Sequence, residues 1–461
     1  MKNENAEMRN HQLKRTISIA AAAVLLLVFS GCGGGPSPSL TVTGDCEGFS
    51  ATVNIPLDKA VAQSQPRAKV FDVFLVGNDG LIAQLSGNEL SGCDLVYSKE
   101  NAWEIKSELH PPSARVKNLA RVVIASVSED PQAVRLMNGA EAQTITAGQL
   151  MLHKSLRILK EEGTSQKNGR SVTVYTTQYG VPLTEFFSEE NISFAVSGFD
   201  GQSAAFGEPE SCLLICNENQ IDLLLPDIRR KIENIAGVMT NPASFHIAAT
   251  GNGIPYDLEQ AGRVLVFNLD GLGYEMLRRA GSEYAPHLNS LKQLQAMAAY
   301  PPISPVSLAS MLTGETPDVH GIHSRSDREM ACEDIFEKAK AMGKTCAYIE
   351  GSQALLNTSL APVLSLNDKE VYENTCKALE ANPDLLFVHF HEIDETAHEY
   401  GPYAEQTMQK IKEIDGFVQA LCESFDGRVI ITADHGLHET EGGGDHGQFL
   451  PEDMIVPYIV V

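Results

Sequence analysis

Two patterns of apolar positions divide the chain. From about residue 41 to residue 255, apolar and polar residues alternate in short runs such as 69–77, 121–127 and 192–198, and Gly, Asn and Asp separate the runs. Alternation with a period of two predicts strands that bury one face, and the separating residues predict turns. We therefore expect a β-rich α+β domain here, either as one body or as two subdomains.

Two stretches of this β-rich segment are alike. Residues 74–83 and 194–204 both begin as a strand and run into the pattern Asp-Gly-x-x-Ala. A duplicated unit would explain the likeness. Two unrelated hairpins would explain it equally well, because Asp-Gly is a common pair in hairpin turns.

The pattern changes at Arg263. From there to the end, short apolar runs alternate with longer amphipathic stretches such as 403–425. This alternation predicts an α/β architecture over residues 262–461, with a mostly parallel sheet flanked by helices. In such sheets, ligands bind beyond the carboxyl ends of the strands.

The N-terminus predicts export. Four basic residues up to Arg15 precede an apolar run that is too short for a comfortable membrane span, so residues 1–31 are expected to be a signal peptide. Phe29 to Cys32 resembles a bacterial lipobox, although Leu is usual where Phe29 stands. We expect a lipid on Cys32 to anchor the protein to a bacterial cell surface, with residues 32–40 as a flexible tether. An ordinary cleaved signal with an incidental Cys32 is the alternative.

Composition narrows the function classes. The formal net charge is −25 and the pI is about 4.9, which argues against a nucleic-acid-binding surface. A small anionic substrate stays compatible with this charge, because a bound dication reverses the local field. The nine cysteines fit no zinc ribbon, and their pairing does not follow from the sequence.

Carboxylate and imidazole side chains follow the predicted strands of the second segment. Asp394 and His398 are four residues apart, so a helical turn would place both on one side, as two ligands of one metal require. The complete set is Asp270, Asp394, His398, Asp434, His435 and His446. Each residue alone is explained as well by a turn, a helix cap or an exposed His. Together they predict a site for Zn²⁺, with Mn²⁺ and Fe as competitors, and disfavour a calcium site built only from oxygen.

Ser304 is the candidate nucleophile. It lies in a Pro-bounded loop just before a predicted helix, where free N–H groups and the helix dipole favour a phosphate. A hydroxyl next to a dication can be deprotonated at neutral pH and attack phosphorus. Capping of the helix by Ser304 and Ser307 is the structural alternative.

Five motifs follow one another between about residues 263 and 461. They are NLDGLG, PPISPVSLASMLTGETPDVHGI, DETAHEYGP, TADHG and GGGDHG. In this order they resemble the alkaline phosphatase superfamily, specifically its type I phosphodiesterase/nucleotide pyrophosphatase branch. The resemblance implies two zinc ions, the first held by Asp394, His398 and His446 and the second by Asp270, Asp434 and His435, with deprotonated Ser304 reaching the second. Asp445 is then expected to be a turn or supporting residue that orients His446.

Three departures from that branch bear on specificity. Ser304 stands where Thr is usual, Pro305 follows it immediately instead of one residue later, and Ser307 replaces a phosphate-binding Asn. Preference for a nucleotide diester therefore stays open. The chain also stops inside a strand-like stretch, residues 454–461, so the domain is either truncated or minimal.

The expected function is a metal-dependent phosphoric ester hydrolase, a phosphodiesterase or phosphatase, that acts on a small phosphate ester through a phosphorylated Ser304. Two alternatives stay open: an inactive, surface-anchored binding module, and a sulfatase, although the sulfatase motif is missing. His323 and Arg325 are either phosphate contacts or residues of a solvated loop. The natural substrate and the oligomeric state do not follow from the sequence.

Part of the β-rich segment, residues 144–204, resembles the molybdopterin-binding domain of sulfite-oxidase-type proteins. That family's metal-ligating Cys and its cofactor-binding residues cannot be placed on this sequence. The resemblance therefore implies an adapted scaffold and disfavours bound molybdopterin.

Overall fold

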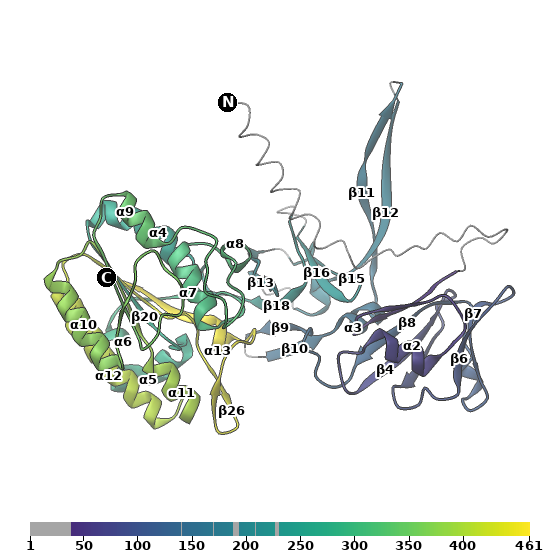
Figure 1. Ribbon diagram of the computed structural model, residues 1–461. Coiled ribbons are helices and arrows are strands. Elements are labelled where there is room, and N and C mark those ends of the chain that lie inside the picture. The colour runs from purple at the N-terminus through teal and green to yellow at the C-terminus, as the bar shows by residue number, and fades with distance from the viewer. Residues whose placement is uncertain (1–37, 140, 169, 188–192, 208, 226–229) are drawn as a thin grey trace. The chain divides into compact units, whose positions relative to one another are not determined.

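The computed structural model describes residues 38–461 except 140, 169, 188–192, 208 and 226–229 (Figure 1). The predicted signal peptide and the predicted lipidation site, Cys32, lie outside the described residues. Within the described part of the chain, no helix has the length and apolar character needed to cross a membrane.

An eight-stranded sheet forms the centre of the C-terminal segment. Its strand order is β19-β21-β28-β25-β20-β24-β22-β23. In that order the strands span Phe245–His246, Gln293–Met297, Ile455–Val460, Arg428–Thr432, Val264–Leu269, Leu385–Phe390, Cys346–Glu350 and Val363–Leu364. β28 runs antiparallel to its neighbours β21 and β25, and the other pairings are parallel. The predicted α/β class with a mostly parallel sheet is confirmed.

Helices cover this sheet and explain its apolar strands. Every residue of β20 and β24 is buried, which requires cover on both faces of the sheet. The helices are α4 (Ala249–Ala261), α5 (Tyr274–Tyr284), α6 (Pro286–Ser290), α7 (Ser304–Thr313), α8 (Pro317–His320), α9 (Ile335–Ala341), α10 (Asp368–Glu380), α11 (Glu392–Tyr400), α12 (Glu405–Ser424) and α13 (Pro451–Met454). A small hairpin, β26 (His438–Thr440) with β27 (Gly443–Asp445), follows β25.

The β-rich segment contains two sheets with the same plan. One has the order β2-β1-β8-β4-β5 and the other the order β10-β9-β18-β13-β14. The first comprises Phe49–Ala51, Leu40–Gly44, Leu119–Ser126, Phe71–Gly77 and Ile82–Ser86, and the second Glu141–Ile145, Val134–Asn138, Ile235–Thr240, Phe194–Gly198 and Ser203–Phe206. In both, the second and third strands are parallel and the other neighbours are antiparallel.

The matching hairpins occupy equivalent places in these two sheets. The Gly77 N–H donates to the Leu81 carbonyl and the Gly198 N–H to the Gln202 carbonyl, each at 2.8 Å. In each turn the Asp side chain also accepts the N–H two residues later, at 3.1 Å for Asp79 and 3.0 Å for Asp200. Equal strand order, direction and turn geometry favour a duplicated unit over two unrelated hairpins.

The remaining elements complete the β-rich segment. A three-stranded sheet has the order β3-β6-β7, and a further sheet has the order β11-β12-β15-β16-β17. These strands and the two helices are β3 (Ile55–Pro56), α2 (Leu57–Ser64), β6 (Cys93–Ser98), β7 (Ala102–Ser107), α3 (Ala147–Leu152), β11 (Leu156–Lys167), β12 (Arg170–Pro182), β15 (Leu213–Asn217), β16 (Gln220–Leu225) and β17 (Arg230–Ile232). The two similar sheets of the β-rich segment contribute to separate apolar cores, one from Leu40 to Ile124 and one from Val134 to Val238. The predicted domain boundaries at residues 255 and 262 stay predictions.

Candidate active site

Three adjacent strands deliver the candidate ligands to one edge of the C-terminal sheet. β20 lies between β24 and β25 and is parallel to both, so their carboxyl ends coincide. Asp270 directly follows β20, and Asp434 with His435 follows β25 after one residue. α11 begins two residues after β24 and carries Asp394 and His398. This edge is where the α/β architecture predicted ligand binding.

Asp394, His398 and His446 form the first group. Their ligand atoms all lie within 4.8 Å of one another. The predicted helical turn places Asp394 Oδ2 and His398 Nε2 3.5 Å apart. The structure thus brings together the three residues that the family resemblance implies for one metal ion.

Asp270, Asp434 and His435 lie beside this group. His435 Nε2 is 3.5 Å from Asp270 Oδ1 and 3.7 Å from Asp434 Oδ2. The other oxygen of Asp434 accepts the Gly271 N–H at 3.2 Å, which fixes the carboxylate beside Asp270. Asp394 also approaches this group, since its ligand atom lies within 4.8 Å of those of Asp270 and His435.

The three histidines present the same nitrogen to the site. In each, Nδ1 faces a backbone carbonyl: Gly444 for His398 at 2.9 Å, Gly436 for His435 at 3.2 Å and Pro302 for His446 at 2.8 Å. A nitrogen that faces a carbonyl oxygen carries the proton, which leaves Nε2 with a lone pair. Histidine ligands of metals are held in this way.

The carboxylates lack partners that a cation would supply. Asp270 Oδ1, Asp394 Oδ1 and Asp434 Oδ2 are buried and make no hydrogen bond within the described part of the chain. Buried carboxylate oxygens without partners are costly, so a divalent cation fits this donor set. Mixed carboxylate and imidazole donors suit Zn²⁺ or Mn²⁺.

The charge balance of the site points the same way. Burial, together with the charge of Asp270, raises the pKa of Asp434 to about 7. Burial lowers the pKa of His435 to about 4 and that of His446 to about 2. Neutral imidazoles and crowded carboxylates are the protonation states of a site that a positive ion completes.

Ser304 is the first residue of α7 and faces the second group. Its Oγ lies 3.2 Å from Nε2 of His435. The cap residue of α7 is Ile303, with no side-chain cap hydrogen bond, so the capping alternative does not describe this helix. Ser307 is fully buried and its Oγ accepts the Ala299 N–H at 3.1 Å. The Ser307 hydroxyl is therefore used inside the core and is not a second candidate nucleophile.

Arg325 reaches the same site. Its Nη2 lies 3.0 Å from Nε2 of His446. Asp327 shapes the loop by accepting the N–H groups of His323 at 2.9 Å and Ser324 at 2.8 Å. The structure therefore favours a contact role for Arg325 over the solvated-loop alternative.

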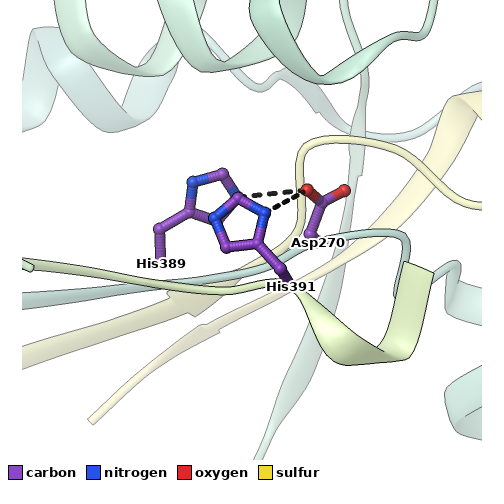
Figure 2. A group of neighbouring side chains, drawn as sticks. All are labelled: Asp270, His389 and His391. Carbon is purple, nitrogen blue, oxygen red and sulfur yellow. Dashed lines mark ion pairs between the residues drawn. The ribbon is translucent and has the colours of Figure 1, made fainter. Parts of the chain in front are cut away.

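A further cluster surrounds Asp270 that the strand-end pattern of the sequence did not predict. It comprises Glu350 at the end of β22, His389 in β24 and His391 just after β24. Figure 2 shows the two histidines beside Asp270. The signal available in the sequence was the spacing of His389 and His391, because residues two apart in a strand face the same side. Asp445, by contrast, lies where expected: it is exposed and its Oδ1 accepts the His446 N–H at 2.8 Å.

Comparison with known proteins gives a family for this segment. Residues 264–340 and 350–456 match the model of a family described as type I phosphodiesterase / nucleotide pyrophosphatase.

Two similar curated proteins are GPI ethanolamine phosphate transferases. The first, GPI ethanolamine phosphate transferase 1 of Neurospora crassa, is 29% identical over 143 residues, 27% of this chain and 14% of the relative. The second, GPI ethanolamine phosphate transferase 3 of Eremothecium gossypii, is 26% identical over 203 residues, 38% of this chain and 20% of the relative. The match therefore spans a fifth or less of these relatives.

A solved structure of phosphonoacetate hydrolase from Sinorhizobium meliloti 1021 is also similar. It is 17% identical with a TM-score of 0.33, and the match covers 40% of this chain and 59% of that one.

Proposed function

We propose that the protein is a metal-dependent phosphoric ester hydrolase, because residues 264–340 and 350–456 match the model of the type I phosphodiesterase/nucleotide pyrophosphatase family. One observation carries the proposal. Three buried carboxylate oxygens, from Asp270, Asp394 and Asp434, have no hydrogen-bond partner among the described residues and lie in the site that Ser304 Oγ faces.

Two divalent cations, proposed to be Zn²⁺ with Mn²⁺ as the alternative, would complete this site. Asp394, His398 and His446 would hold one of them, and Asp270, Asp434 and His435 the other. When bound, such ions stabilise the negative charge on the attacking and leaving oxygens of an in-line displacement.

The side chains of the protein itself would bind and attack the substrate. The positive end of the α7 dipole favours a phosphoryl group next to Ser304, although Pro305 has no N–H and the N–H groups of Val306 and Ser307 donate to the Ile303 carbonyl. Arg325 would donate to a phosphoryl oxygen, since its guanidinium already lies against His446.

The reaction would proceed in two displacements. Ser304 Oγ gives its proton to solvent and bonds to phosphorus while the bond from phosphorus to the leaving oxygen breaks, and the leaving group takes up a proton from solvent. A water molecule then attacks phospho-Ser304 and frees the serine and the phosphate. Loss of the serine oxygen would therefore stop turnover and leave the ligand groups intact.

A panel assay tests the proposal. Aryl phosphate monoesters, aryl phosphate diesters and an aryl sulfate would be supplied to the purified protein with and without a chelator. We expect chelator-sensitive hydrolysis of a phosphate ester. Hydrolysis of the sulfate alone would favour the sulfatase. Absence of both turnover and bound metal would favour the inactive binding module.

In the second displacement proposed above, water accepts the phosphoryl group, and the curated relatives suggest a different acceptor. Both are named as ethanolamine phosphate transferases, so an alcohol could replace water in the second displacement. An aryl diester of phosphoethanolamine, supplied with an alcohol acceptor, separates the two functions. A phosphoethanolamine product on the acceptor indicates transfer, and free phosphoethanolamine indicates hydrolysis.

The proposed cellular location rests on Cys32, in the lipobox-like stretch from Phe29 to Cys32. We propose that a lipid on Cys32 anchors the exported protein to a bacterial cell surface. Detergent phase partitioning of wild-type and Cys32→Ser protein tests this. Recovery of both in the aqueous phase would rule out the anchor.

A further inference from the structure

We infer that the second β-rich sheet, which has the order β10-β9-β18-β13-β14, positions His446 and so sets the affinity of the first metal group for its ion. His446 lies in the loop between β27 and α13, and two residues that follow it, Gln448 and Phe449, contact this sheet. This role rests on the proposed function, in which His446 is a metal ligand, and it gives the β-rich segment a part in the metal site.

Gly237 of β18 makes room for Phe449. A methyl group on Gly237 would lie 2.2, 2.6 and 2.7 Å from three atoms of the Phe449 ring. Phe449 is buried in an apolar cluster, whose members from the sheet are Met137, Ala195 and Met239. The ring therefore packs directly on the backbone of β18, and this contact fixes a residue three positions after His446.

Arg135 of β9 holds the neighbouring residue of the same loop. Its Nη2 donates to Gln448 Oε1 at 2.5 Å. Arg135 is the register partner of Gly237, so the two residues lie side by side on one face of the sheet. That face thus holds Gln448 by a charge-assisted hydrogen bond and Phe449 by close packing.

The duplicated first sheet shows that the fold itself does not require this glycine. Gly237 pairs with the residue before Gly198. At the equivalent place in the first sheet, Arg121 pairs with the residue before Gly77. A sheet of this plan therefore accepts a long side chain where β18 has a glycine, so the glycine serves the contact with Phe449.

The second sheet also reaches the nucleophile loop, which orients His446 from its other side. His446 Nδ1 faces the Pro302 carbonyl at 2.8 Å. Tyr300, two residues earlier, has its ring centroid 6.0 Å from that of Phe199, directly after β13, and 5.9 Å from that of Phe449. The carbonyl that orients His446 and the loop that carries His446 are therefore held from the same sheet. Changes to groups that orient a metal ligand typically lower metal affinity about 10–100-fold.

Zinc titration of the full chain against a competing chelator tests this role. His446→Ala identifies the binding step of the first group, because it removes one ligand of that group. We expect Gly237→Ala to weaken the same step about tenfold or more and to leave the other step unchanged.

Val238→Ala is the matched control for Gly237→Ala. Val238 is the next residue of β18, and its side chain lies in the apolar core on the opposite face of the sheet. Val238→Ala should therefore lower the unfolding midpoint and leave both zinc affinities unchanged.

A pair of arginine variants tests the same role without a change at Gly237. Arg135→Ala should weaken the first-group step, because it releases Gln448. Arg121 is half-buried on β8 and donates to the Met151 carbonyl at 3.4 Å, so Arg121→Ala should leave both zinc affinities unchanged.

The outcomes separate this inference from the proposed function. Equal zinc affinities within both pairs, Gly237→Ala with Val238→Ala and Arg135→Ala with Arg121→Ala, overturn the inference and leave the proposed function standing. Zinc binding that Gly237→Ala weakens, in a wild type that hydrolyses no phosphate ester, does the reverse. If Gly237→Ala does not fold, the arginine pair decides. A wild type without the binding step that His446→Ala removes overturns both.

Discussion

Ser304 and Ser307 lie one turn apart on α7 but differ in what their hydroxyls contact. Ser304 Oγ faces His435, and Ser307 Oγ accepts a backbone N–H inside the core. We expect Ser304→Ala to lower kcat by about 10³-fold or more, as loss of a nucleophile does, with the bound metal unchanged. Steady-state assays and metal analysis measure both.

Ser307→Ala is the matched control for that substitution. It leaves the Ala299 N–H buried without a partner, which costs about 1–3 kcal/mol of stability but removes no reacting atom. Turnover should therefore stay near the wild-type rate while the unfolding midpoint falls. Normal turnover in Ser304→Ala would contradict the covalent mechanism.

The two copies of Asp-His-Gly predict unequal roles for their aspartates. Asp434 is fully buried and one of its oxygens has no hydrogen-bond partner in the part of the chain that the structure describes, whereas Asp445 is exposed and accepts a backbone N–H. Asp434→Ala should remove a metal ligand and abolish turnover. Asp445→Ala should lower kcat about tenfold, in line with the loss of a supporting contact. Equal losses of kcat in the two variants would show that this division is wrong.

Among the elements, α4 sets the position of the helix that carries Ser304. A methyl group on Gly251 of α4 would lie 2.5 Å from the Met311 carbonyl oxygen and 2.6 Å from the Gly314 N, at the end of α7. Gly251→Ala must therefore push the two helices apart, and we expect a loss of about 1–3 kcal/mol in urea unfolding.

Gly253 gives the control on the same helix. The nearest atom to a methyl group there is an Asp257 carboxylate oxygen at 3.8 Å, an ordinary contact. Gly253→Ala should stabilise the protein by up to about 1 kcal/mol, because Ala favours helix over Gly. Equal destabilisation by both substitutions would mean that the close approach of α4 and α7 is not what Gly251 serves.

The order of strands and helices along the chain was the feature of the fold that the sequence predicted best. Parallel strands bring their carboxyl ends to one edge, so Asp270, Asp394 and Asp434 could be expected to meet from the strand pattern alone. The spacing of His389 and His391 was a signal for part of the cluster beside Asp270, but Glu350 could not be expected there, because it lies on β22 and only the pairing of β22 with β24 brings it close. The contact between Ser304 and His435 likewise joins residues 131 positions apart.

At the scale of the whole molecule, the second β-rich sheet shares an apolar cluster with the C-terminal segment, whereas the first β-rich sheet has a core of its own. The core of the C-terminal segment contains residues from Ile247 to Ile459, and the two β-rich cores contain residues from Leu40 to Ile124 and from Val134 to Val238. A fourth cluster joins β9, β13 and β18 to the C-terminal segment and comprises Met137, Ala195, Met239, Ala243, Met297, Phe449 and Met454. A ligand stabilises only the cooperative unit that binds it, by about 4 kcal/mol when it is present at 1,000 times its Kd.

Metal removal should therefore lower the midpoint temperature of one thermal unfolding transition, that of the unit that binds the metal. Calorimetry of the full chain with zinc and with chelator should show a transition that moves to lower temperature without metal, and the core from Leu40 to Ile124 should give another that stays in place. Ser304→Ala should keep the whole shift, because it removes no carboxylate, whereas Asp434→Ala should lose most of it. A single transition that shifts as a whole would instead show that the β-rich segment and the C-terminal segment unfold as one unit.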